Sequence, residues 1–151
     1  MKSLPIVWQR LVDPEGNTCG RCGNTHESVL AAVEALKEIL KPLDVAPILE
    51  TREIDSESFR VDPSQSNRIW IAGKPIEEWL DAKVSSSCCD TVCEGAHCRT
   101  LEIDDRTFEV IPPGMVIKAA LIAASKMVDS AKRAGGCACD TGCCTHRHSP
   151  F

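Results

Sequence analysis

The 151-residue sequence contains no tyrosine and few other aromatic residues, with only three tryptophans and three phenylalanines. So few rings do not indicate a platform for stacking bases. An excess of basic residues is also missing, because the formal net charge is -5. This charge argues against a cationic surface for the phosphates of a nucleic acid. We therefore interpret the tryptophans as packing residues: Trp8, Trp70 and Trp79.

Long apolar runs are absent as well. The longest apolar region, 115–128, is interrupted by Lys118 and Lys126, so no membrane span is expected. The apolar stretch near the N-terminus stops at Gln9 and has no small-residue cleavage site, so no secretory leader is expected. Phosphate-binding glycine loops, G-x-S-x-G elbows and H-E-x-x-H motifs do not occur either. We predict a cytoplasmic protein without membrane or nucleic-acid partners.

Cysteine is the residue in excess, with 10 in the chain. In a cytoplasmic protein of this size, clustered cysteines indicate metal binding or redox chemistry more often than structural disulfides. They form a C-x-x-C pair (Cys19 and Cys22), a group within 88–98 and a group within 137–144. None of them lies at a position that the apolar periodicity assigns to the core, so we expect them to be available for chemistry.

Apolar periodicity predicts a small α/β sandwich. The expected domain is 1–134, with a cysteine-rich insertion at 85–99 and a Cys/His-rich tail at 135–151. Within it we expect strands at 4–12, 45–54 and 68–72, a hairpin at 100–110 completing the sheet, long helices at 24–40 and 113–134, a short helix near 76–80, and a loop at 55–67. The expected core face of the first helix contains Val29, Leu30, Val33, Leu36, Ile39 and Leu40. The expected core face of the hairpin contains Leu101, Ile103, Phe108 and Val110.

The C-x-x-C pair lies between the first predicted strand and the first predicted helix. Unpaired amides and the positive end of a helix dipole stabilise a thiolate there, and Arg21 adds a cation. A thiolate is the nucleophile of disulfide exchange and also the form that binds metal. Cys19 and Cys22 are therefore candidates for a redox dithiol; the alternative is half of a structural zinc knuckle. His26 is expected on the surface of the first helical turn.

The order of an early strand, Cys19-Gly20-Arg21-Cys22, a long helix and the stretch 69–76 resembles the thioredoxin-like superfamily over about 4–131. The stretch 69–76 looks like the strand and turn of glutaredoxin-type members. The cysteines of 88–98 followed by 99–103 resemble an uncharacterised prokaryotic thioredoxin-like family, known mainly as a domain of unknown function. The resemblance implies that Cys19, as the more exposed thiol, attacks a disulfide and Cys22 resolves the mixed disulfide.

The sequence departs from the superfamily pattern at two places. Thr18 replaces the tryptophan that usually precedes the redox pair. The cis-proline that faces the dithiol and helps to dock substrate is missing, and Ser66, Asn67 and Arg68 occupy that region. We expect this absence to leave the pair more open to a metal or to a small thiol. Gly23 and Asn24 are expected to delay the helix.

The other eight cysteines are candidate ligands of zinc or another soft ion, because closely spaced thiolates on a loop suit Zn(II), Cu(I), Hg(II) or As(III). The insertion and the tail share the pattern C-D-T-x-C. A glycine hinge at 135–136 would let the tail reach the C-x-x-C pair; the alternative is a plain surface tail. The candidate ligands are Cys88, Cys89, Cys93, Cys98, Cys137, Cys139, Cys143 and Cys144.

Three functions compete at this point. The first is a thiol–disulfide redox protein, whose partners are protein or small-molecule thiols and disulfides. The second is a non-catalytic protein that binds or traffics a soft metal or metalloid. The third, an iron–sulfur protein, has little support from the cysteine spacing. The sequence predicts neither the substrate nor the oligomeric state.

Overall fold

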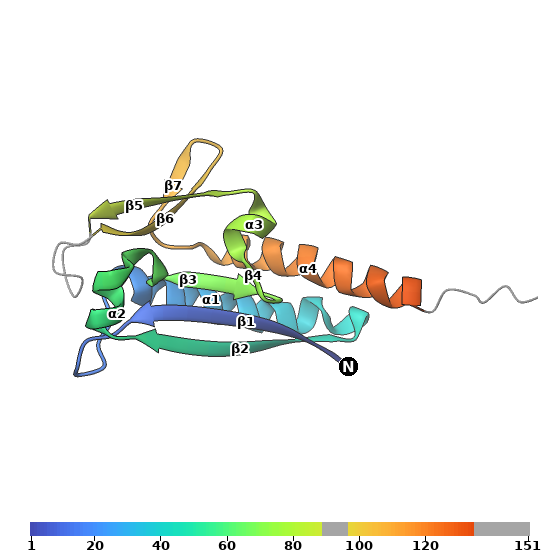
Figure 1. Cartoon of the computed structure of the whole chain (residues 1–151). Coiled ribbons are helices and arrows are strands. Elements are labelled where there is room, and N and C mark those ends of the chain that lie inside the picture. The colour runs from blue at the N-terminus through green and yellow to red at the C-terminus, as the bar shows by residue number, and fades with distance from the viewer. Residues whose placement is uncertain (89–96, 135–151) are drawn as a thin grey trace, which may run out of the picture.

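The computed structural model describes residues 1–88 and 97–134, and its fold is mixed α/β with two separate sheets (Figure 1). The elements, in chain order, are β1 (Lys2–Leu11), α1 (Gly20–Ile39), η1 (Lys41–Leu43), β2 (Val45–Ile54), α2 (Ser56–Val61), η2 (Pro63–Gln65), β3 (Arg68–Ile71), β4 (Lys74–Pro75), α3 (Ile76–Leu80), β5 (Lys83–Cys88), β6 (His97–Ile103), β7 (Arg106–Phe108) and α4 (Pro113–Ala134). None of these helices is long and apolar enough to cross a membrane.

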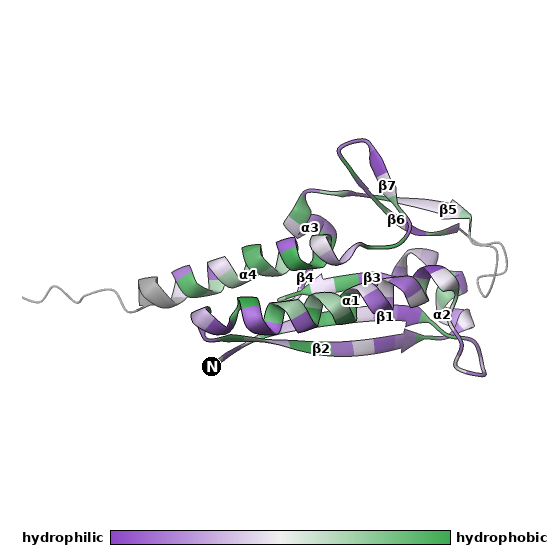
Figure 2. Ribbon diagram, turned by 180° about the vertical axis from the view of Figure 1, so that it is seen from behind, coloured by the Kyte–Doolittle hydropathy of each residue, from purple (hydrophilic) through white to green (hydrophobic). Residues whose placement is uncertain are grey.

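The central sheet has the strand order β2-β1-β3-β4. Strand β1 pairs with β2 in parallel, which is possible because the chain crosses over through α1 between them. On its other side β1 pairs with β3 in the antiparallel direction. Alternate residues of β1 point to one face, where Leu4, Ile6 and Trp8 are fully buried. Helices α1 and α4 pack against each other on that face, and their apolar stripes supply much of the rest of the core (Figure 2).

The second sheet has the order β5-β6-β7 and is antiparallel throughout. Asp104 and Asp105 form its tight turn with φ of 49° and 62°, the left-handed conformation of a two-residue hairpin. The hairpin was therefore predicted, but the expectation that it completes the central sheet is wrong. Strand β5 was also not predicted, because the polar run Ser85-Ser86-Ser87 has no apolar alternation to reveal it.

The predicted core is only partly correct. Val29, Val33, Leu36 and Leu40 are buried, as expected. Leu30 and Ile39 are 45% and 44% exposed, because the buried stripe of α1 is narrower than predicted. On the hairpin Leu101 is buried, whereas Ile103, Phe108 and Val110 are only half-buried.

One helix boundary and one additional helix also differ from the prediction. Helix α1 begins at Gly20, not near Asn24, because Cys19 serves as its N-cap. Helix α2 lies inside the predicted loop, capped by the Asp55 carboxylate, which accepts the Ser58 amide at 2.7 Å, and anchored by buried Phe59. Helix α4 starts at Pro113 as predicted. The expected tail at 135–151 lies outside the described residues, so that domain boundary stays a prediction.

Candidate functional site

The C-x-x-C pair forms the first turn of α1. Cys19 occupies the N-cap in an extended conformation, with φ of -74° and ψ of 163°, and its sulfur accepts the backbone amide of Cys22 at 3.5 Å. A cap normally uses a hydroxyl or carboxylate oxygen to satisfy one of the open amides, and here the sulfur does so. The positive end of the helix dipole therefore lies at Cys19 itself.

Both sulfurs of this turn lie inside the protein. Cys19 is 3% exposed and Cys22 is 1% exposed, and both belong to the hydrophobic core cluster. Cys19 is the more exposed of the two, but only slightly, and the expectation that this pair lies outside the core is wrong. The expectation that the cysteines avoid the core is also wrong for Cys98, which is 1% exposed. A reactant must move part of the surrounding structure to reach Cys19.

The Cys22 thiol holds its proton strongly. The interaction with the Cys19 side chain and, to a smaller extent, burial raise the pKa of the Cys22 thiol far above its ordinary value. Hydroxyl groups of Ser66 and Thr18 oppose this shift in the pKa of Cys22. The protonated Cys22 thiol is therefore the stable form at neutral pH, and its hydrogen bond supports negative charge on the Cys19 sulfur.

Ser66 stands where the superfamily resemblance placed a missing proline, and it fills that space. Its hydroxyl oxygen lies 3.4 Å from the Cys22 sulfur, and Ser66 is fully buried. The expectation that this region leaves the dithiol open is therefore wrong. Every peptide bond described in the structure is trans.

Asn67 fixes the backbone that presents Ser66. Its φ of 55° lies in the left-handed region, which asparagine tolerates better than most residues. The Asn67 side-chain oxygen accepts the indole N–H of Trp8 at 3.3 Å, and its amide nitrogen donates to the Glu109 carbonyl at 3.3 Å. These bonds connect β1, the start of β3 and the segment after β7 directly beside the dithiol.

Trp8 lies under the first turns of α1. The ring of His26 stacks on it with centroids 4.5 Å apart and planes 6° apart, and Arg10 lies 5.3 Å from the Trp8 ring centroid. His26 is therefore half-buried and not a plain surface residue as predicted. Burial and the nearby Arg10 charge lower the pKa of His26 below its ordinary value.

Arg21 connects the dithiol turn to the second sheet. Its guanidinium donates to the backbone carbonyls of Ser87 and Cys98, at 3.4 Å and 3.5 Å, and of Cys88 at 3.1 Å. It also forms an ion pair with Glu109 at 3.2 Å. The Arg21 charge, which was predicted to assist a thiolate, is thus directed to these carbonyls and this carboxylate. The same bonds hold the C-terminal end of β5 and the N-terminal end of β6 beside Cys19 and Cys22.

Arg99 makes a second polar connection nearby. Its side chain is 6% exposed and forms an ion pair with Glu77, which is 11% exposed, and it donates to the Ser64 carbonyl at 3.1 Å. Burial lowers the pKa of Arg99, while the Glu77 carboxylate opposes that change. This pair holds η2, and therefore the chain leading into Ser66, against α3 and β6.

Only two of the eight candidate metal ligands lie among the described residues. Cys88 is opposite His97 and is exposed, whereas Cys98 is opposite Ser87 and is buried. Neighbouring ladder positions point to opposite faces, so the two cysteine side chains do not converge. Among the described residues no group of three or more His, Cys, Asp or Glu could hold a metal ion. The other candidates lie outside the described residues: Cys89, Cys93, Cys137, Cys139, Cys143 and Cys144.

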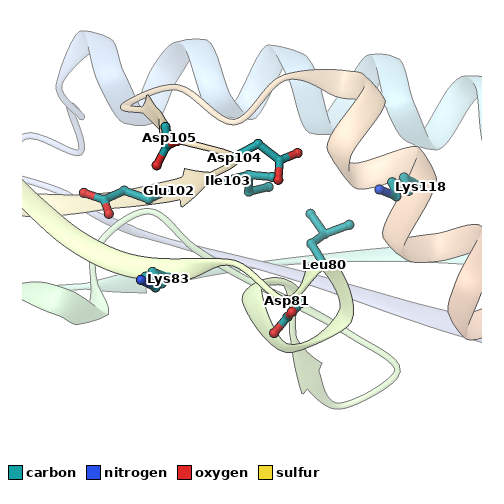
Figure 3. Close-up of a pocket in the computed structure, with 8 residues that line it drawn as sticks. All are labelled: Leu80, Asp81, Lys83, Glu102, Ile103, Asp104, Asp105 and Lys118. Carbon is teal, nitrogen blue, oxygen red and sulfur yellow. The ribbon is translucent and has the colours of Figure 1, made fainter.

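A surface pocket of about 510 Å³ lies away from the dithiol, between the end of α3, the β6–β7 turn and α4 (Figure 3). No cysteine lines it. It is lined by two apolar residues, Leu80 and Ile103, and by six charged residues: Asp81, Lys83, Glu102, Asp104, Asp105 and Lys118.

The structure adds Ser66, Asn67, Trp8 and Arg99 to the site that the sequence predicted. Ser66 and Asn67 are separated from Cys22 by more than forty positions, so no local spacing links them. The one available signal was the resemblance, which marked 66–68 as the region facing the dithiol.

Comparisons with known proteins agree with the extent of this fold. The family described as "Domain of unknown function (DUF2703)" matches residues 4–120, which include both sheets and the dithiol. An uncharacterized protein of Archaeoglobus fulgidus is 41% identical over 113 residues, covering 75% of this chain and 82% of that protein. No solved structure matches significantly. The chain therefore belongs to the DUF2703 family.

Proposed function

We propose that the protein is a thioredoxin-like thiol–disulfide redox protein whose reactive pair is Cys19 and Cys22. The observation that carries this proposal is the hydrogen-bonded turn, in which the Cys19 sulfur caps α1 and the buried Cys22 thiol is held protonated beside it. One sulfur favoured as thiolate next to one kept as thiol is the arrangement that sequential disulfide exchange needs.

The exchange proceeds in two balanced steps. The Cys19 thiolate attacks one sulfur of a substrate disulfide, forms a mixed disulfide, and releases the other half as a thiolate that takes a proton from water. Cys22 then loses its proton and attacks the Cys19 sulfur. The Cys19–Cys22 disulfide forms, and the second half of the substrate leaves as a thiol carrying that proton. The protein is thereby oxidised and the substrate reduced.

The burial of Cys19 bears on the substrate. A cysteine that is 3% exposed does not meet a large folded partner without movement of its surroundings. We therefore expect small disulfides to react faster than disulfides within folded proteins, and we expect small alkylating reagents to modify Cys19 faster than bulky ones.

The proposal is tested with the reduced, full-length protein and glutathione disulfide, followed by mass spectrometry. Trypsin cuts after Arg21, so a Cys19–Cys22 disulfide would link two peptides that each contain one cysteine. We expect this linked species in the wild type, no adduct at position 19 in Cys19→Ser, and a trapped mixed disulfide in Cys22→Ser. Cys88→Ser, which removes an exposed cysteine, is the matched control and should behave as wild type.

Binding of a soft metal without catalysis is the competing function. Elemental analysis of protein purified without oxygen separates the two, because it should find stoichiometric zinc or another soft ion if metal binding is the role. Wild-type protein that carries such an ion and forms no Cys19–Cys22 disulfide would refute the redox proposal. The cytoplasmic location stays a prediction.

A further inference from the structure

We propose that the Ser66 hydroxyl assists the resolving step by donating a hydrogen bond to the Cys22 sulfur as that sulfur becomes a thiolate. This inference rests on the proposed function and assigns a role to a residue in the same site. It starts from the 3.4 Å contact between the Ser66 oxygen and the Cys22 sulfur, both inside the protein, where Ser66 is fully buried and Cys22 is 1% exposed.

Two hydroxyls lie near Cys22, and their hydrogen-bond partners differ. The Thr18 hydroxyl donates to the Leu11 carbonyl at 2.9 Å, so its single proton is engaged. Ser66 contacts the Cys22 sulfur through its oxygen and can direct its own proton there. Of the two, Ser66 is therefore the donor suited to a negative charge on Cys22.

The need for a donor follows from burial. A thiolate at Cys22 forms in a site almost without water, where an uncompensated charge is costly and a hydrogen bond to a charge is strong. Cys19 and burial raise the pKa of the Cys22 thiol, so this thiol keeps its proton in the resting state, and its sulfur lone pairs can accept a hydrogen bond from Ser66. When Cys22 gives up its proton, the Ser66 donor is already in place.

The position of Ser66 is fixed by its surroundings. Asn67 holds the adjoining backbone in the left-handed region through its bonds to Trp8 and Glu109. Among the groups that act on Cys22, Cys19 is the titratable one, and Thr18 and Ser66 contribute hydroxyls. The neighbouring charge of Arg21 is directed to Glu109 and to carbonyls of the second sheet.

The test follows the mixed disulfide at Cys19 after mixing reduced protein with glutathione disulfide, with acid quenching, trypsin digestion and mass spectrometry. We expect resolution in Ser66→Ala to be slower by about tenfold or more, because one hydrogen bond to a charged group is lost. We also expect the pH profile of the resolution rate in Ser66→Ala to be shifted to higher pH than in the wild type. Thr25→Val is the matched control, because it removes a buried hydroxyl that accepts the Ile111 amide at 3.2 Å and does not act on Cys22.

Ser66→Thr and Ser66→Val complete the test, because their side chains have similar volumes and differ in the hydroxyl. We expect the threonine variant to resolve faster than the valine variant, and this pair decides the matter if Ser66→Ala does not fold. Equal rates and equal pH profiles within both comparisons would overturn the role of Ser66. Absence of any adduct or disulfide at Cys19 in the wild type would instead refute the proposed function. In that case, alkylation of Cys22 against pH in Cys19→Ser, with and without Ser66→Ala, still tests the hydrogen bond.

Discussion

Removal of Glu77 should strongly destabilise the protein, because it would leave Arg99 as a buried, uncompensated charge. The Arg99 side chain is 6% exposed and its partner is 11% exposed, so little water is available to replace the carboxylate. Breaking one half of a buried ion pair costs about 3–5 kcal/mol. That is a large share of the total stability of a typical domain, about 5–15 kcal/mol.

The double substitution Glu77→Leu with Arg99→Met should recover most of this loss. Both charges are then absent, and apolar side chains of similar length occupy the space, which is often close to neutral for stability. The remaining cost is the hydrogen bond from Arg99 to the Ser64 carbonyl, a contribution of about 1 kcal/mol. Glu77→Leu alone should therefore be the less stable of the two variants, although it changes fewer residues.

Thermal and urea unfolding of the wild type, both single variants and the double variant measure this coupling. For a chain of this length, the Glu77→Leu cost corresponds to a fall in the melting temperature of about 6–20 °C. A Glu77→Leu variant as stable as the wild type would show that the pair is effectively solvated. A double variant no more stable than Glu77→Leu would show that packing, and not charge, sets the cost.

Three further predictions concern the core and the surroundings of the dithiol. Burial and Arg10 lower the pKa of His26 in the folded state below its value in the unfolded state. As the pH falls through the range of these two pKa values, the unfolded state binds more protons and the folded protein loses stability. Unfolding midpoints at about pH 7.5 and about pH 5.5 should therefore differ more in the wild type than in His26→Gln. Leu36→Ala, at a fully buried position, should cost about 2–5 kcal/mol in urea unfolding, and a loss below about 1 kcal/mol would contradict the described core. Asn67→Gly should be more stable than Asn67→Ala by about 1 kcal/mol in the same assay, because only glycine adopts positive φ without strain, and the reverse order would contradict the left-handed backbone.

The sequence predicted the long elements well because their signals are local. The apolar stripe of Val29, Val33 and Leu36 and the proline at the start of α4 act within a few residues of one another. The start of α1 was misplaced because a sulfur cap is not among the usual N-cap residues, and Gly23 and Asn24 suggested a later beginning. Separate sheets could not be predicted from strand patterns, because alternation does not indicate which strands pair.

The dithiol could be located from its spacing, but its environment could not. Burial of Cys19 and Cys22 depends on residues from β1, the start of β3 and other distant segments, which only the fold brings together. Arg21 was expected to assist a thiolate, whereas its charge is directed to Glu109 and to backbone carbonyls of β5 and β6, and backbone carbonyls leave no trace in the sequence. Ser66 was noticed for the proline it replaces, and its contact with Cys22 emerged from the tertiary structure.

The acceptors that Arg21 uses on β5 and β6 have an evolutionary consequence. Every amino acid carries a backbone carbonyl, so exchanges of side chain at positions 87, 88 and 98 would preserve these three bonds. An insertion or deletion that shifts the pairing of Ser87 with Cys98 would remove them. Relatives that retain an arginine between the two cysteines should therefore vary in residue type at positions 87 and 88, whereas position 98 should stay small and apolar because it is buried, and the pairing of the two strands should stay unchanged.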